Sequence, residues 1–170
     1  PSLPSIEEMA QPQLRLAGIR INPNTNGPSR SGYVTGFTLR DMSTGSDRTI
    51  TGLPENPVIT NVSWSPDGSH IAFLLTKTDR LELWIANVEQ ARAWRLVNGK
   101  VNDTYYGSPM DWTEDGESLI VKFVPEGRGE APVRDMIPTG PVIQENTSGA
   151  RPARTYQDLL EDSHDEDLFD

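Results

Sequence analysis

Residues 62–73 read Val-Ser-Trp-Ser-Pro-Asp-Gly-Ser-His-Ile-Ala-Phe, and residues 110–121 repeat the pattern as Met-Asp-Trp-Thr-Glu-Asp-Gly-Glu-Ser-Leu-Ile-Val. The tryptophans of the two copies are 48 residues apart (112 − 64). Ser, Pro, Asp and Gly each suit their position in a type I turn. Each copy therefore predicts a hairpin in which Trp ends one strand and the apolar run begins the next.

The repeated positions each have a structural and a chemical interpretation. They are Trp64, Asp67, Gly68, Trp112, Asp115 and Gly116. Large aromatic residues at equivalent positions of a repeat usually fill the gap between neighbouring units, so we expect both tryptophans in the core. The two aspartates lie on equivalent turns of different units, which favours turn formation over paired acid/base chemistry or metal binding. By the same reasoning Trp84 is expected in the core, whereas Trp94, beside Arg92 and Arg95, is expected at the surface.

A second similarity sets the period of the repeat. Residues 81–88 match residues 34–41 at an offset of 47, and a short strand candidate follows each, at 92–96 and 48–51. A period of roughly 40–50 residues built only of strands is typical of the blades of a β-propeller.

The strand candidates are apolar on both faces. In residues 71–75, Ile, Phe and Leu point one way while Ala and Leu point the other. A sheet with one face in water would alternate apolar and polar residues, whereas a blade is covered on both sides by its neighbours. A buried parallel sheet gives the same pattern, but it needs crossover helices, and the intervening segments are too rich in Gly, Pro and Thr for those.

These patterns predict an all-β fold, a partial propeller of about two to three four-stranded antiparallel blades over residues 1–154. Residues 155–170 form an acidic segment that leads toward the next blade, with a short helix over 155–162 and a loop or second turn after it. The content of 14 Gly and 14 Pro in 170 residues favours short strands and tight turns over long helices.

Charge and composition narrow the possible partners. The net charge is −10, and seven acids without a base fall within residues 155–170. Such a surface repels phosphate, so we expect no nucleic-acid partner. No apolar run approaches the roughly 20 residues of a membrane span. The acidic run lacks the spacing of a calcium loop, so we expect no metal site and no cofactor. Because the chain starts at Pro1 without a leader, either a leader has been removed or the chain is an internal fragment.

The Trp-Ser-Pro-Asp-Gly repeat resembles the propeller repeat of prolyl oligopeptidase-family serine peptidases, and a similar repeat occurs in several bacterial periplasmic propellers. Further stretches look like the glutamyl endopeptidase branch of that family. They are residues 14–23, 124–129, 137–145 and 154–160, with Asp165 and Glu166 downstream. The resemblance covers nearly the whole chain.

The resemblance implies a larger enzyme in which the propeller caps a C-terminal α/β-hydrolase domain. There the propeller would gate peptide substrates by size and wall the cavity, and the branch is expected to prefer Glu beside the cut bond. Bacterial members would be periplasmic or secreted, and plant members would be in the chloroplast.

The chain itself carries no catalytic motif. It contains no Gly-x-Ser-x-Gly sequence, and its two histidines, His70 and His164, lack a nucleophile motif. We therefore expect no catalytic residue and no activity of this chain alone. Arg128, between two glycines, is the candidate substrate-binding residue, because an exposed guanidinium on a flexible loop could grip a substrate carboxylate. Its structural alternative is a turn arginine paired with Glu126 or Glu130.

Other functions remain open from the residues. The chain could be a stand-alone propeller that binds a protein or peptide, or part of a propeller glycosidase, which would need carboxylates converging on the central channel. Two to three blades cannot close a ring, so open strand edges and an apolar blade face also predict self-association.

Overall fold

The computed structural model of the chain describes residues 6, 10–134, 160 and 162–169. Its strands are short, and its helix lies near the C-terminus. The elements are β1 (Leu14–Leu16), β2 (Ile19–Asn22), β3 (Gly27–Pro28), β4 (Thr38–Arg40), β5 (Asp47–Thr49), β6 (Ile59–Trp64), β7 (His70–Thr76), β8 (Leu81–Asn87), β9 (Arg92–Arg95), β10 (Met110–Trp112), β11 (Leu119–Val121) and α2 (Ser163–Phe169).

The strands form four antiparallel sheets of neighbours in sequence. These are β1-β2-β3, the upstream hairpin β4-β5, the central sheet β6-β7-β8-β9 and the downstream hairpin β10-β11. The predicted all-β class with a short helix near the C-terminus is confirmed, and the arrangement is consistent with a partial propeller. Only the central sheet has four strands in the described part of the chain.

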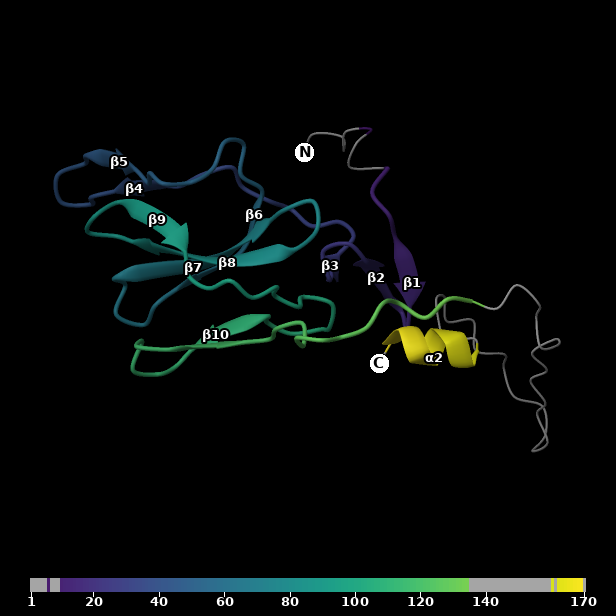
Figure 1. Cartoon of the computed structure of the whole chain (residues 1–170). Helices are drawn as coiled ribbons and strands as arrows, with labels where there is room; N and C mark the ends of the chain where they lie inside the picture. The colour runs from purple at the N-terminus through teal and green to yellow at the C-terminus, as the bar shows by residue number, and fades with distance from the viewer. Residues whose placement is uncertain (1–5, 7–9, 135–159, 161, 170) are drawn as a thin grey trace, which may run out of the picture.

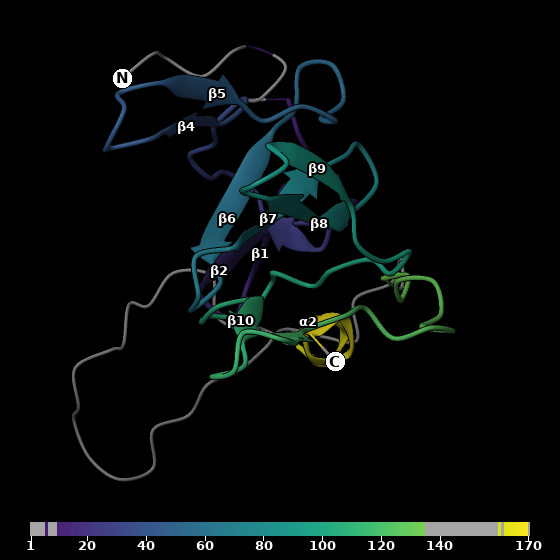
Figure 2. The same ribbon diagram turned by 90° about the vertical axis from the view of Figure 1, so that its left-hand side faces the viewer.

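The central sheet is buried on both faces, as its alternation predicts. From β7, Ile71 and Phe73 enter one core cluster, whereas Ala72 and Leu74 enter the other. The upstream hairpin adds Ile50, Phe37 and Leu39 to the first cluster. Figures 1 and 2 show the two hairpins on opposite sides of the central sheet, so that three layers stack face to face.

The downstream hairpin closes the second cluster from the other side. Met110 is buried there, and Trp112, Leu119 and Val121 pack against it. The core therefore consists of two interfaces between successive sheets, and each interface depends on residues from both of its sheets.

The two Trp-containing hairpins have the same strand pairing, at the predicted offset of 48 residues. Trp64 pairs with Ile71, and Trp112 pairs with Leu119. The turns close alike, with 2.9 Å from Ser65 N to His70 O and 2.9 Å from Thr113 N to Ser118 O. The downstream hairpin is thus the equivalent of β6-β7.

The upstream hairpin is the equivalent of β8-β9, but at an offset of 46 rather than the predicted 47. Asp41 Oδ1 accepts the N–H of Thr44 at 3.2 Å, and Asn87 Oδ1 accepts that of Gln90 at 2.8 Å, which sets the offset at 87 − 41 = 46. A slip of one residue exchanges the faces of a strand. The sequence alignment was wrong by one residue because it matched two aromatic residues, and Phe37 corresponds to Leu83 instead of Trp84.

The sheet β1-β2-β3 packs at the end of the central sheet where β8 begins. Its first turn is tight, with positive φ at Ala17 (49°) and Gly18 (76°). A β-carbon on Gly27 would lie 2.8 Å from Leu81 Cδ1, so the backbone of β3 approaches β8 closely. The N–H of Asp103 donates to Asn26 O at 2.8 Å.

The described helix near the C-terminus begins after the residues for which a helix was predicted. It spans Ser163–Phe169, where the sequence predicted a loop or second turn, and Leu160 is not helical. Most of the predicted helix 155–162 lies outside the described residues, as does the predicted boundary at 154. Asp162 caps the start of α2, because its carboxylate accepts the N–H of Asp165 at 3.0 Å. Among the described residues no helix is long and apolar enough to cross a membrane.

Replacing Phe73 by Ala should destabilise the fold strongly. Its side chain is fully buried, lies edge-on to Phe37 at 5.2 Å and stacks on Trp84 at 6.5 Å between ring centroids. We expect a loss of about 3–5 kcal/mol in the free energy of unfolding, measured by urea denaturation. The control Val62→Ala, at an exposed position of the same sheet, should change it by less than about 0.5 kcal/mol. Similar losses for both variants would contradict the two-faced core.

Candidate functional site

The aspartates of the two repeat turns are engaged in turn formation. Asp67 Oδ1 accepts hydrogen bonds from Ser65 Oγ at 2.6 Å and from Ser69 N at 3.0 Å. These bonds, with the Ser65 hydroxyl first, lower the pKa of Asp67 to about 2. Thr113 and the Glu117 N–H likewise lower the pKa of Asp115. Both carboxylates are therefore ionised and cap their turns through Oδ1.

The two glycines of these turns adopt the left-handed conformation, each with φ of 72°. The turns lie next to each other, since a β-carbon on Gly116 would be 3.4 Å from Pro66 Cδ. Gly68 and Gly116 are thus required by backbone geometry, and the equivalent turns meet at the same end of neighbouring sheets.

The tryptophans occupy different environments despite their equivalent positions. Trp112 is half-buried, packs against the second core cluster and donates from Nε1 to Ser63 O at 3.3 Å. Trp64 is 53% exposed, so its predicted core position is wrong. Trp112 rests on β6 through Ser63, but in the described part of the chain the unit before Trp64 shows only the equivalents of β8-β9, so Trp64 has no equivalent strand to rest on there. Trp84 packs in the first core cluster and Trp94 is exposed, as predicted.

His70 is not placed to activate a serine. Its Nδ1 lies 2.7 Å from Ser69 Oγ and its Nε2 lies 3.2 Å from Asn87 Nδ2. With Asn87 donating to Nε2, Nδ1 carries the proton and donates to Ser69, whose hydroxyl donates to Asp67 at 2.9 Å. The direction of this chain of bonds is the reverse of a catalytic serine–histidine pair. His164 lies on α2.

Arg128 lies on an exposed turn that follows the downstream hairpin. Its N–H donates to Pro125 O at 3.3 Å, and Gly127 has φ of 81°. Of the acidic residues that the structure describes, Glu126 and Glu130 included, none forms an ion pair with Arg128. A substrate contact by Arg128 stays a prediction.

Two acidic residues near the C-terminus form ion pairs with Arg134. Arg134 Nη2 lies 3.0 Å from Asp162 Oδ2 and 3.2 Å from Asp165 Oδ1. Tyr105 donates from its hydroxyl to Phe169 O at 2.9 Å, and the two rings meet edge-on at 5.4 Å. The two described segments on either side of 135–161 therefore lie together, and α2 contacts the loop before β10.

A buried charged cluster on β8 was not found from the sequence. Glu82, 3% exposed, accepts from Arg80 Nε at 2.9 Å and from Trp84 Nε1 at 3.0 Å, and Arg95 Nη1 lies 3.5 Å away. Burial by itself raises the pKa of Glu82, but the bonds from Trp84 and Arg80 and the charge of Arg95 outweigh it, so the pKa is lowered. The sequence feature that could have indicated this cluster is an acidic residue, Glu82, within an otherwise apolar strand.

Glu82→Gln should weaken the fold and change its pH dependence. Because the folded-state pKa is lowered, ionised Glu82 stabilises the fold above its usual pKa, and this contribution is lost as the pH falls through the folded value. We expect a loss of about 1–3 kcal/mol at neutral pH and a flatter stability curve in acid, measured by urea denaturation. The exposed control Glu89→Gln should leave both unchanged. An equally steep acid limb in Glu82→Gln would contradict this role.

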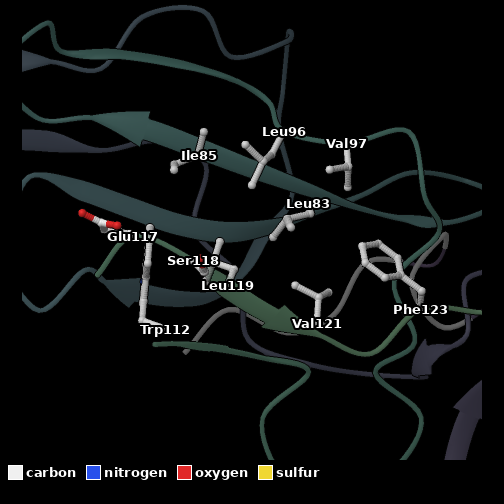
Figure 3. Close-up of a pocket in the computed structure, with 10 residues that line it drawn as sticks. All are labelled: Leu83, Ile85, Leu96, Val97, Trp112, Glu117, Ser118, Leu119, Val121 and Phe123. Carbon is white, nitrogen blue, oxygen red and sulfur yellow. The ribbon is translucent and has the colours of Figure 1, made fainter. Parts of the chain in front are cut away.

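An apolar groove of about 220 Å³ separates the last two strands of the central sheet from the downstream hairpin. Figure 3 shows aliphatic side chains facing one another across it. One wall carries Leu83, Ile85, Leu96 and Val97, and the other carries Leu119 and Val121. Glu117 is the only titratable residue among the side chains that line it. The groove is suited to binding an apolar segment rather than to chemistry.

Two curated relatives resemble the chain along its length. The protein named probable glutamyl endopeptidase, chloroplastic, of Oryza sativa subsp. japonica is 36% identical over 183 residues, which cover 99% of this chain and 19% of the relative. The protein of the same name from Arabidopsis thaliana is 34% identical over 182 residues, with the same coverage. The chain spans about a fifth of each relative. No protein-family model matches the chain.

Proposed function

We propose that this chain is a non-catalytic part of a β-propeller in a larger serine peptidase of the prolyl oligopeptidase family. The observation that carries the proposal is the similarity of 99% of the chain to proteins named glutamyl endopeptidase. The fold supports it, because a sheet buried on both faces by its neighbours is what a propeller blade requires.

In the parent protein the propeller would gate and wall the cavity of a C-terminal α/β-hydrolase domain that cleaves peptides. The chain has no Gly-x-Ser-x-Gly motif, and the bond directions around His70 are unsuited to activating a serine. Its role would therefore be to position and select substrates. The stand-alone binding module is the weaker alternative, because the chain matches only 19% of relatives that are more than five times its length.

The intact parent enzyme tests the role of Arg128. An exposed guanidinium that forms no ion pair with the described residues can bind a substrate carboxylate. Arg128→Ala should raise KM for Glu-containing peptides about tenfold with kcat unchanged, the lower end of what a charge-assisted hydrogen bond contributes.

The matched control is Arg92→Ala, an exposed arginine on β9. It should leave KM unchanged, and Arg128→Ala should leave the KM of uncharged peptides unchanged. Wild-type kinetics of Arg128→Ala on Glu peptides would end the substrate role, and peptidase activity of the 170-residue chain alone would contradict the non-catalytic assignment.

We also propose that the isolated chain self-associates through its uncovered groove and open strand edges. Leu96 and Val97 are both more than a third exposed there, and apolar surface of this kind favours association. Light scattering should give a mass above that of the monomer, rising with concentration. Val97→Asp should lower it, while Met42→Asp, on the upstream hairpin, should not. A strictly monomeric chain would contradict this expectation.

A further inference from the structure

We propose that the apolar groove is the binding site of a β-hairpin formed by residues that follow Asp170 in the parent protein. This hairpin would add a third and a fourth strand to β10-β11 and complete a second four-stranded sheet. The inference rests on the proposed function only in taking the chain as part of a longer protein. Its evidence is the internal repeat, the chemistry of the groove and the position of α2.

The repeat defines where the third strand would pair. In the central sheet, Ile71 and Phe73 of β7 pair with Ala86 and Trp84 of β8. The positions 48 residues later, Leu119 and Val121, have no strand beside them on that edge within the described part of the chain. The N–H of Lys122 donates to Pro109 O at 2.9 Å, so the backbone groups of Lys122 face β10. Because backbone groups of successive residues in a strand point to opposite edges, those of Leu119 and Val121 point to the open edge.

The same comparison defines what side chains the hairpin must carry. Phe37, Leu39 and Ile50 of the upstream unit are covered by the central sheet through Trp84 and Ala86 of β8. Their equivalents 46 residues later are Leu83, Ile85 and Leu96, all of which line the groove. The third strand must therefore place apolar side chains at alternate positions over the groove, as β8 does over the upstream hairpin.

The upstream hairpin of a second copy does not fit this groove. The face that would enter the groove carries Thr38, Arg40 and Asp47, all exposed. Arg40 and Asp47 form a bidentate pair with both distances 2.7 Å. Burying that pair against aliphatic side chains costs more desolvation energy than it returns. A distinct hairpin with an apolar face is required.

The path of the chain favours a hairpin that follows α2. In the central sheet the second and third strands are joined by residues 77–80, closed by Lys77 N to Arg80 O at 2.9 Å. After β11, Arg134 pairs with Asp162 and Asp165, and Phe169 contacts Tyr105. Lys122, at the end of β11, donates to Tyr106 O at 3.4 Å. The end of α2 at Phe169 thus lies near the end of β11, where an antiparallel third strand would begin.

Hydrogen exchange directly tests whether the following residues pair with β11. We would compare the 170-residue chain, in dilute solution, with a chain carrying roughly 50 further residues of the natural sequence, about one repeat. The amides of Leu119 and Val121 should exchange at least about 100-fold more slowly in the longer chain. The amide of Ile120, which faces β10, should be equally protected in both. Unchanged exchange at Leu119 and Val121 would overturn the proposal.

A pair of variants makes the test independent of folding defects. Val97→Asp, in the groove, should abolish the added protection in the longer chain and leave the exchange of the 170-residue chain unchanged. Met42→Asp should affect neither chain.

Alternative occupants give different results. Protection of Leu119 and Val121 that the longer chain gains only at high concentration, and not in dilute solution, would identify a second copy as the occupant, and protection gained only on N-terminal extension would identify an upstream segment. Either result would overturn the proposal. Because the exchange experiment does not measure peptidase activity, failure of the hairpin proposal is distinguishable from failure of the proposed function.

Discussion

The burial of both faces of the central sheet is the constraint on which the rest of the structure depends. From Ile71 to Leu75 every side chain of β7 is enclosed, alternately toward the upstream and the downstream hairpin. Neither cluster can form within one sheet, because each takes residues from two. Stability is then a sum over neighbouring interfaces, and a sheet without a neighbour exposes the surface it would have buried.

This dependence explains which features could be predicted from sequence. The Ser-Pro-Asp-Gly turn and the alternation of 71–75 are local, and both predict the hairpin and two buried faces. The burial of Trp64 is not local, because it depends on which strands precede it. The charged cluster at Glu82 likewise requires Arg95 of β9 to approach it from the neighbouring strand, beside Arg80 from the loop before β8.

The two ends of the stack have different chemistry. The outer face of the upstream hairpin carries Thr38 and the Arg40–Asp47 pair, which suit water. The downstream side instead opens into an aliphatic groove. The 46-residue register matters here, since a slip of one residue would exchange these faces.

The residues with freedom for function lie where the repeat is interrupted. Residues 77–80 close the central sheet with a short loop, whereas the equivalent position after β11 opens into the turn that carries Arg128 and the segment held by Arg134. Asp67 in its turn and Glu82 on β8 are committed to a turn and to ion pairs. A side chain that contacts a substrate must be free of such commitments, and Arg128, exposed and without an ion pair among the described residues, meets that condition.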